Sequence, residues 1–236
     1  MACRLCTWLS AGLCSGSGMD CASFWRQSER WERAHSNEWK LWSEETDENR
    51  ELIARAIALR ESDPKETFRL DLEAANAGSI RGMTLVAWHY DTGTTVKSDF
   101  WQAQEYYYRA LSAGSWMATI RYAKLLAKHG YYDYCERVLE DGVRADFIPA
   151  YFWLAWFRVK QSNTRGTCRQ VRHLLEYAAE HGHPGAKLIL SRWLLSGRFG
   201  LRHIPSGWRA FREFVSFVIA QNEAQKEPPA QTQSSA

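Results

Sequence analysis

Residues 176–191, EYAAEHGHPGAKLILS, decide the fold class of this chain. Small residues lie four positions before and four positions after Gly182, at Ala178 and Ala186, and larger apolar residues follow at helical spacing. Spacings of three and four on both sides of a glycine predict two amphipathic helices that meet at a turn. Glycine readily adopts the left-handed conformation that ends a helix, so we expect Gly182 to be the turn residue.

The same pattern occurs three more times towards the N-terminus. The turn residues, which we call anchors, are Gly78 in ANAGSIRG, Gly114 in LSAGSWMA, Asp146 in RADFIPA and Gly182 in EHGHPGA, spaced 36, 32 and 36 residues apart. Aspartate tolerates the left-handed conformation better than most residues do, so Asp146 can take the place of glycine. Because one helix pair cannot bury its own apolar stripe, the repetition predicts pairs that stack into a solenoid.

Small residues accompany every anchor. They lie four before, four after and nine after it, at Ala74, Gly82 and Ala87; Ala110, Ala118 and Ala123; Gly142, Ala150 and Ala155; and Ala178, Ala186 and Ser191. We expect the residue four after the anchor to let the two helices of a pair approach closely. The residue nine after it is expected to face the next pair.

The loop that follows the second helix of a pair also recurs, as HYDTGTTVKSDF and LLSGRFGLRHIP. Val96 and Leu201 are predicted to be buried in the core and so to hold this loop in place. Asp99 is predicted to cap the helix that follows.

These features resemble Sel-one-like repeats, which are helix-turn-helix relatives of tetratricopeptide repeats. The matching residues are Ala74, Ala75, Gly78, Val86, Ala87, Tyr90, Gly93, Val96 and Asp99 in the first copy, and Ala178, Ala179, Gly182, Ala186, Leu190, Gly197 and Gly200 in the fourth. The second copy lacks the glycine loop and the third has Asp146 for glycine. The resemblance implies an all-α fold, a right-handed α-α superhelix (solenoid) of about four helix-turn-helix repeats with helical caps, and an adaptor role in a bacterial protein.

The domain organisation follows from where the repeats begin and end. We expect a disordered leader over residues 1–21, with Met19 as an alternative translation start, and a helical N-terminal cap over 22–63. The repeats are assigned to 64–208, a closing helix to 209–222 and a disordered polar tail to 223–236. The alternative for the cap is a small separate docking element, and the alternative for the closing helix is a membrane-surface helix.

Composition excludes several classes of partner. The 30 Lys and Arg residues nearly balance the 27 Asp and Glu residues, which leaves no basic field for nucleic acid. No apolar stretch is long enough for an integral membrane span. The 12 tryptophans are scattered along the chain. We expect them to fill gaps between helices, and an aromatic ligand platform is the alternative.

The sequence offers little catalytic or metal-binding chemistry. Four of the six cysteines, Cys3, Cys6, Cys14 and Cys21, crowd the leader, which is not a disulfide framework. Cys3 and Cys6 have zinc-like spacing but lack a second ligand pair. Nucleophile, phosphate-loop and dinucleotide motifs are missing from the sequence, so we predict no catalytic residue, no cofactor and no metal. His181 and His183 are predicted to serve the turn; metal binding is the alternative.

A non-catalytic scaffold is the function that this pattern favours, with a protein or peptide as partner. The candidates for the binding face lie nine and five residues before each anchor, at Arg69, Glu73, Glu105, Arg109, Arg137, Asp141, His173 and Tyr177. One alternative is an enzyme with a cleft between cap and repeats. Another is an exported envelope protein that assists assembly of a polysaccharide or secretion complex. The expected location is the cytoplasm, or the periplasm if the leader is an unusual signal peptide.

Overall fold

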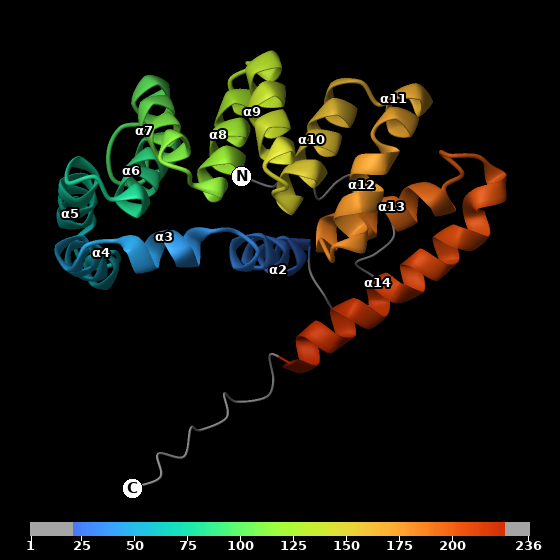
Figure 1. Cartoon of the computed structure of the whole chain (residues 1–236), viewed down its shortest axis with the longest axis horizontal. Coiled ribbons are helices and arrows are strands. Elements are labelled where there is room, and N and C mark those ends of the chain that lie inside the picture. The colour runs from blue at the N-terminus through green and yellow to red at the C-terminus, as the bar shows by residue number, and fades with distance from the viewer. Residues whose placement is uncertain (1–20, 225–236) are drawn as a thin grey trace, which may run out of the picture.

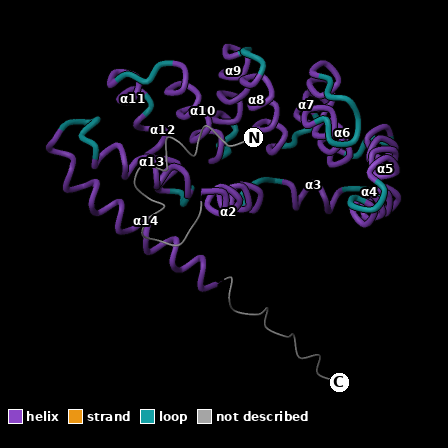
Figure 2. The backbone as a smooth tube through the Cα atoms, turned by 180° about the vertical axis from the view of Figure 1, so that it is seen from behind, coloured by secondary structure: helices purple, strands orange, loops and turns teal. Residues whose placement is uncertain are grey.

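The structure is a computed structural model that describes residues 21–224, and every regular element in this range is a helix (Figures 1 and 2). In chain order the elements are α2 (Cys21–Ala34), α3 (Glu38–Glu44), α4 (Asp47–Leu59), α5 (Pro64–Asn76), α6 (Ile80–Thr92), α7 (Phe100–Ser112), α8 (Trp116–Lys128), α9 (Tyr132–Arg144), α10 (Ile148–Gln161), α11 (Arg165–Gln170), α12 (Arg172–Glu180), α13 (Pro184–Leu195), η1 (Leu201–His203) and α14 (Ile204–Ala224). The predicted leader, with Cys3, Cys6 and Cys14, and most of the predicted tail lie outside the described residues.

The four predicted helix pairs are present as α5–α6, α7–α8, α9–α10 and α12–α13. From α4 to α10 each helix packs against the next along the chain, α10 also packs against α12, and α12, α13 and α14 continue the series; the short α11 lies between α10 and α12. The pairs follow one another in an arc (Figure 1). The predicted all-α solenoid is therefore confirmed.

All four anchors adopt the left-handed conformation. The φ angles are 91° at Gly78, 92° at Gly114, 56° at Asp146 and 91° at Gly182, and Asp146 is the one residue other than glycine with positive φ within 21–224. In each copy the backbone N–H of the residue after the anchor donates to the carbonyl of the residue four positions before the anchor, at 2.9–3.0 Å. This bond is the defining feature of a Schellman turn, which satisfies carbonyls at the helix end.

The residue after the anchor begins the second helix. The Ser79 and Ser115 hydroxyls and the His183 ring each accept a hydrogen bond from the backbone N–H three residues later. They are N-caps, which satisfy a donor that the helix itself leaves unpaired. Phe147 occupies this position in the third copy and makes no cap bond. Helix end, turn and helix start are therefore compressed into three residues, with the anchor in the middle, which we call the elbow.

Small side chains permit the close packing behind each elbow. A Cβ added at Gly82 would lie 2.7 Å from the Ala75 backbone nitrogen, and one added at Gly142 would lie 2.8 Å from the Ala150 Cβ. The residues nine after the anchors, Ala87, Ala123, Ala155 and Ser191, are fully buried. Larger side chains at these positions would force the helices apart.

One of the loop predictions is wrong. Asp99 caps α7 as expected, because its carboxylate accepts from the Trp101 and Gln102 N–H groups, and Val96 is half-buried. Leu201, however, is 79% exposed. Phe199 enters the core instead and packs against Trp193, because the loop of the fourth copy has a different geometry around Gly200.

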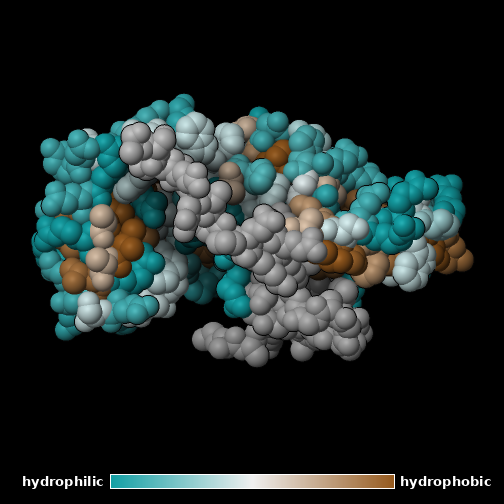
Figure 3. All heavy atoms as spheres, turned by 90° about the horizontal axis from the view of Figure 1, so that it is seen from below, coloured by the Kyte–Doolittle hydropathy of each residue, from teal (hydrophilic) through white to brown (hydrophobic). Residues whose placement is uncertain are grey.

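Helices outside the repeats cover both ends and one side of the arc. Helix α4 packs on α5, where the Thr67 hydroxyl donates to the Ala56 carbonyl. Helices α3 and α2 then run beneath the arc towards its other end (Figures 1 and 2). Helix α14 packs on α13 and leaves an apolar outer side, where hydrophobic residues show brown in Figure 3. No described helix combines the length and apolarity needed to cross a bilayer.

We predict that Gly82→Ala destabilises the fold. The new methyl group would meet the α5 backbone at 2.7 Å. Overpacking of this kind costs about 1–3 kcal/mol, which outweighs the gain of about 1 kcal/mol in helix propensity. Gly166→Ala is the control, because its methyl would meet the nearest atom at an ordinary 3.5 Å. Urea unfolding should give a lower midpoint for Gly82→Ala alone. Equal midpoints for the two variants would contradict the close approach.

Candidate functional site

The eight residues predicted for partner binding lie on the first helices α5, α7, α9 and α12. Several are held by neighbours on the same helix. Arg69 pairs with Glu66 at 2.7 Å and with Glu73 at 3.0 Å, and Asp141 pairs with Arg144. Arg109 lies over the Tyr106 ring, 5.0 Å from its centre. His173 is exposed.

Tyr177 has a structural partner at the third elbow. The Tyr177 and Tyr151 hydroxyls both donate to the Asp146 carboxylate, at 2.8 and 3.2 Å, and their rings stack with centres 4.4 Å apart. Burial, together with the bond to Asp146, raises the pKa of Tyr151 to about 12. The carboxylate that replaces the anchor glycine therefore ties α12 and α10 together.

Exposed aromatic residues gather on α7 and α9, beside three of the predicted binding residues. Trp101, Glu105 and Tyr108 share one exposed face of α7, and Tyr134, Arg137 and Asp141 share one of α9; we call these six residues the outer patch. Trp101, Tyr108 and Tyr134 are 67%, 56% and 58% exposed, and the Arg137 guanidinium lies 5.2 Å from the centre of the Tyr134 ring.

The two halves of the outer patch adjoin each other through α8. Burial raises the pKa of Tyr122 on α8, and the nearby phenols of Tyr108 and Tyr134 raise it further. Both outer tyrosines thus lie close to one side chain of the helix packed between them. Sequence analysis identified the charged members of this surface and missed Trp101, Tyr108 and Tyr134, whose helical spacing from Glu105 and Arg137 was the available signal.

The other side of the repeats is covered by α2 and α3. Residues 25–45, which we call the strap, bond to the row of elbows. Glu45 accepts from the Ser79 hydroxyl at 2.8 Å, at the start of α6. Asn37 accepts from the Trp116 N–H at 3.1 Å and donates to the Gly114 carbonyl at 2.7 Å, at the start of α8. The strap supplies acceptors to helix N-termini, where backbone N–H groups and the helix dipole favour them.

The fourth elbow holds the strap through a buried polar cluster. The Glu32 carboxylate accepts from Trp153 Nε1 at 3.0 Å and from His183 Nε2 at 3.3 Å. Glu32 is 1% exposed and His183 is 0% exposed. Because His183 Nδ1 accepts the Ala186 N–H and Nε2 donates to Glu32, the imidazole is the neutral tautomer with its proton on Nε2.

Burial governs the charge of this cluster. It lowers the pKa of His183, and His35 and Lys124 act in the same direction, while the bond to Glu32 opposes them. The Lys124 ammonium lies 4.0 Å from the centre of the Trp153 ring. Burial lowers the pKa of Lys124 as well, against the attraction of Glu32 and Glu29.

His181 and His183 do not form a pair. The His181 ring is exposed and donates to the Tyr177 carbonyl at 2.8 Å, as predicted for an imidazole at a helix end. Both nitrogens of His183 are already bonded inside the protein. Among residues 21–224, no group of three or more His, Cys, Asp or Glu side chains is arranged to hold a metal ion.

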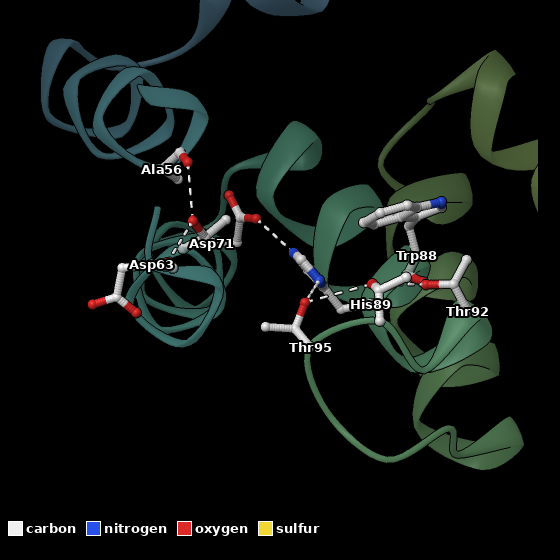
Figure 4. Close-up of polar contacts among 9 residues, drawn as sticks. Ala56, Asp63, Asp71, Trp88, His89, Thr92 and Thr95 are labelled. Carbon is white, nitrogen blue, oxygen red and sulfur yellow. Dashed lines mark hydrogen bonds and ion pairs between the residues drawn. The ribbon is translucent and has the colours of Figure 1, made fainter. Parts of the chain in front are cut away.

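A second buried polar chain joins α5, α6 and the loop that follows (Figure 4). His89 Nε2 donates to Asp71 at 3.0 Å, and His89 Nδ1 lies 2.6 Å from the Thr95 hydroxyl. An acid, an imidazole and a hydroxyl in series can activate a nucleophile. Here, however, Asp71 and His89 are buried in the first repeat. The shallow hollow between α3 and α6, lined by Trp42, Glu45 and Arg81 among others, includes none of the three. We therefore infer that these hydrogen bonds hold the loop against α5 and α6.

The sequence signal for this polar contact is an acidic residue at a position where the other repeats have large, mostly apolar residues. Asp71 lies seven residues before Gly78, where the other copies have Tyr107, Leu139 and Leu175. All four side chains are buried. A carboxylate in that position requires a partner, and His89 supplies it.

We predict that acidification destabilises the protein through His183. Its folded pKa lies below the unfolded value of about 6.5, so the unfolded state takes up a proton first as the pH falls. The stability contribution is complete above about pH 6.5 and is lost below it. His183→Asn keeps an N-capping side chain and should flatten the fall in melting temperature between pH 7.5 and 5.5. His181→Asn, the exposed control, should leave it unchanged. An equal fall in wild type and His183→Asn would contradict the buried neutral imidazole.

We predict strong coupling between Asp71 and His89. Removing His89 alone, as His89→Leu, leaves a buried carboxylate unpaired and should cost about 3–5 kcal/mol. The double variant Asp71→Leu/His89→Leu should recover most of this loss, since it places leucine where Leu139 and Leu175 lie in other copies. Urea unfolding of the two single variants and the double variant measures the coupling. Additive losses would show that the contact contributes nothing.

Comparisons with known proteins support the fold. No protein-family model and no curated protein matches the sequence. Among solved structures, the chain is similar to a Sel1 repeat protein from Oxalobacter formigenes, with 17% identity and a TM-score of 0.57 over 70% of this chain and 73% of the other. It is also similar to a protective antigen of uropathogenic Escherichia coli strains that displays an SLR fold, with 18% identity and a TM-score of 0.57.

The E. coli match covers 71% of this chain and 38% of the antigen, so the chain corresponds to well under half of that protein. MamA from Desulfovibrio magneticus RS-1 is similar over 75% of this chain and 98% of its own, with 16% identity and a TM-score of 0.51. Likeness at such identities carries the fold and not the activity. The chain is thus a helical-repeat protein with the solenoid architecture of Sel1-like and TPR-like proteins.

Proposed function

We propose that this chain is a non-catalytic scaffold that binds a protein partner through the outer patch on α7 and α9. The observation that carries the proposal is the exposure of Trp101, Tyr108 and Tyr134 on two helices that both pack against α8. Tryptophan, tyrosine and arginine are the residues that contribute most binding energy at protein interfaces. Helical-repeat folds commonly use such surfaces for protein interaction.

The charges of the outer patch indicate the kind of partner segment. Glu105 lies between Trp101 and Tyr108 along α7, and Arg137 lies between Tyr134 and Asp141 along α9, so exposed rings alternate with charges of both signs. Aromatic residues and arginine are enriched at protein interfaces. We expect the partner to present an apolar side chain between the tyrosines and a carboxylate opposite Arg137.

Buried chemistry supports a non-catalytic role. Glu32, Asp71 and His89 are almost entirely inaccessible to solvent. Burial raises the pKa of the Cys135 thiol to about 12, so this group is protonated near neutral pH and is a poor nucleophile. The ionisable groups that could support an enzyme are therefore committed to holding helices together.

Tagged protein purified from its native cells, with its companions identified by mass spectrometry, tests this proposal. Tyr108→Ala/Tyr134→Ala should lose the partner at least about tenfold, because each hot-spot side chain contributes about 2 kcal/mol or more. Arg69→Ala/Glu73→Ala is the matched control, since it alters two exposed predicted residues on α5 away from the patch. Loss of the partner in the control and its retention in the tyrosine variant would contradict the proposed face.

A further inference from the structure

The inner surface beneath α2 has the properties of a second recognition site, separate from the outer patch. It is formed by Lys124 on α8, by Phe152, Trp153 and Trp156 on α10, and by His183 at the start of α13. Three aromatic rings, one cation and the hydrogen-bond donors of Trp153 and His183 therefore face the same helix. We call these five residues the inner surface.

Helix α2 shows what this surface recognises. The Trp25 ring lies between 6.3 and 6.4 Å, centre to centre, from the rings of Phe152, Trp153 and Trp156. One and a half turns later, Trp31 meets His183 edge-on with ring centres 5.2 Å apart. Glu32 follows at once and accepts from Trp153 and His183. Two tryptophans and a carboxylate on one side of a helix thus meet a complementary surface.

The contact between α2 and the inner surface is complementary but incompletely satisfied. The Ser28 hydroxyl is fully buried and makes no hydrogen bond to any residue in the described range. The buried Glu32 carboxylate accepts from Trp153 and His183 and is attracted by the Lys124 ammonium, so docking of α2 takes two charged groups out of water. Leaving a polar group unpaired and burying a charge both oppose docking, so the seated state of α2 is not greatly favoured over release.

The rest of α2 is suited to leaving the surface. Its opposite face carries Arg26, Glu29, Arg30 and Arg33, which are exposed. Within the described residues, its link to α3 is the short turn around Ser36 and Asn37. A released α2 would be a soluble amphipathic segment that remains tethered to α3.

We propose that the inner surface binds an amphipathic helix of a partner protein, with two tryptophans six positions apart and a glutamate directly after the second, and that α2 is the intramolecular occupant displaced by that helix. Binding of an apolar helix face to a complementary surface is an established recognition mode. The occupant seen in the structure defines the chemistry of the partner. This site does not depend on the outer patch, and either could exist without the other.

A labelled peptide of α2, Cys21–Ala34, is the probe, and fluorescence anisotropy gives its affinity for the chain. Wild type should bind it weakly, because α2 competes from within the molecule. Trp31→Ala in the chain weakens the internal helix and leaves the inner surface intact. It should therefore raise the peptide affinity at least about tenfold, in proportion to the fraction of molecules with α2 released. Unchanged affinity in Trp31→Ala would overturn the proposal.

Peptide variants supply a control that does not depend on protein folding. A peptide with Trp31→Ala and Glu32→Gln should bind the Trp31→Ala chain at least about tenfold more weakly than the native peptide. Equal binding of the two peptides would mean that the inner surface does not read this pattern. Light scattering distinguishes the remaining occupant. A monomeric Trp31→Ala chain agrees with the proposal, and a dimer would assign the inner surface to α2 of a second copy instead.

Discussion

The elbow is the constraint on which the rest of this structure depends. At each elbow the chain passes from one helix to the next within three residues, because a left-handed anchor closes a Schellman turn and the next residue precedes the second helix. Such a short connection forces the helices of a pair together. Only small residues at positions such as Gly82 and Ala150 fit between them. Stacking of successive pairs then produces the arc (Figure 1).

The elbows also determine where the strap docks. The second helices of the pairs begin in a row along one side of the arc. At three of these helix starts a strap residue, Glu45, Asn37 or Glu32, accepts a hydrogen bond. At the first and fourth elbows the capping side chain, Ser79 or His183, is itself the donor to the strap. Helices α2 and α3 cover this side of the repeats and leave the outer faces of α7 and α9 exposed. The exposed aromatic residues on these faces are therefore the principal candidate for recognition.

Local patterns predicted the repeats because elbows are made from residues close in sequence. The four anchors, the small residues around them and the Asp99 cap were all recognisable from spacing alone. Leu201 was assigned to the core by alignment with Val96, and the prediction was wrong because Phe199, two residues earlier, is the residue of this loop that is buried. The position of the strap was not predictable in this way. Glu32 and His183 are 151 residues apart, and the residues around each of them do not indicate which residue is its partner.

The central claim is that α2 is seated on the inner surface but is held less firmly than the repeats. Hydrogen–deuterium exchange of the intact protein tests it directly, because amide exchange measures local opening. We expect amides of α2 to exchange more slowly than those of the free Cys21–Ala34 peptide and faster than those of α8 and α10. Exchange of α2 at the rate of the free peptide, while α8 and α10 stay protected, would show that α2 is not seated on the inner surface.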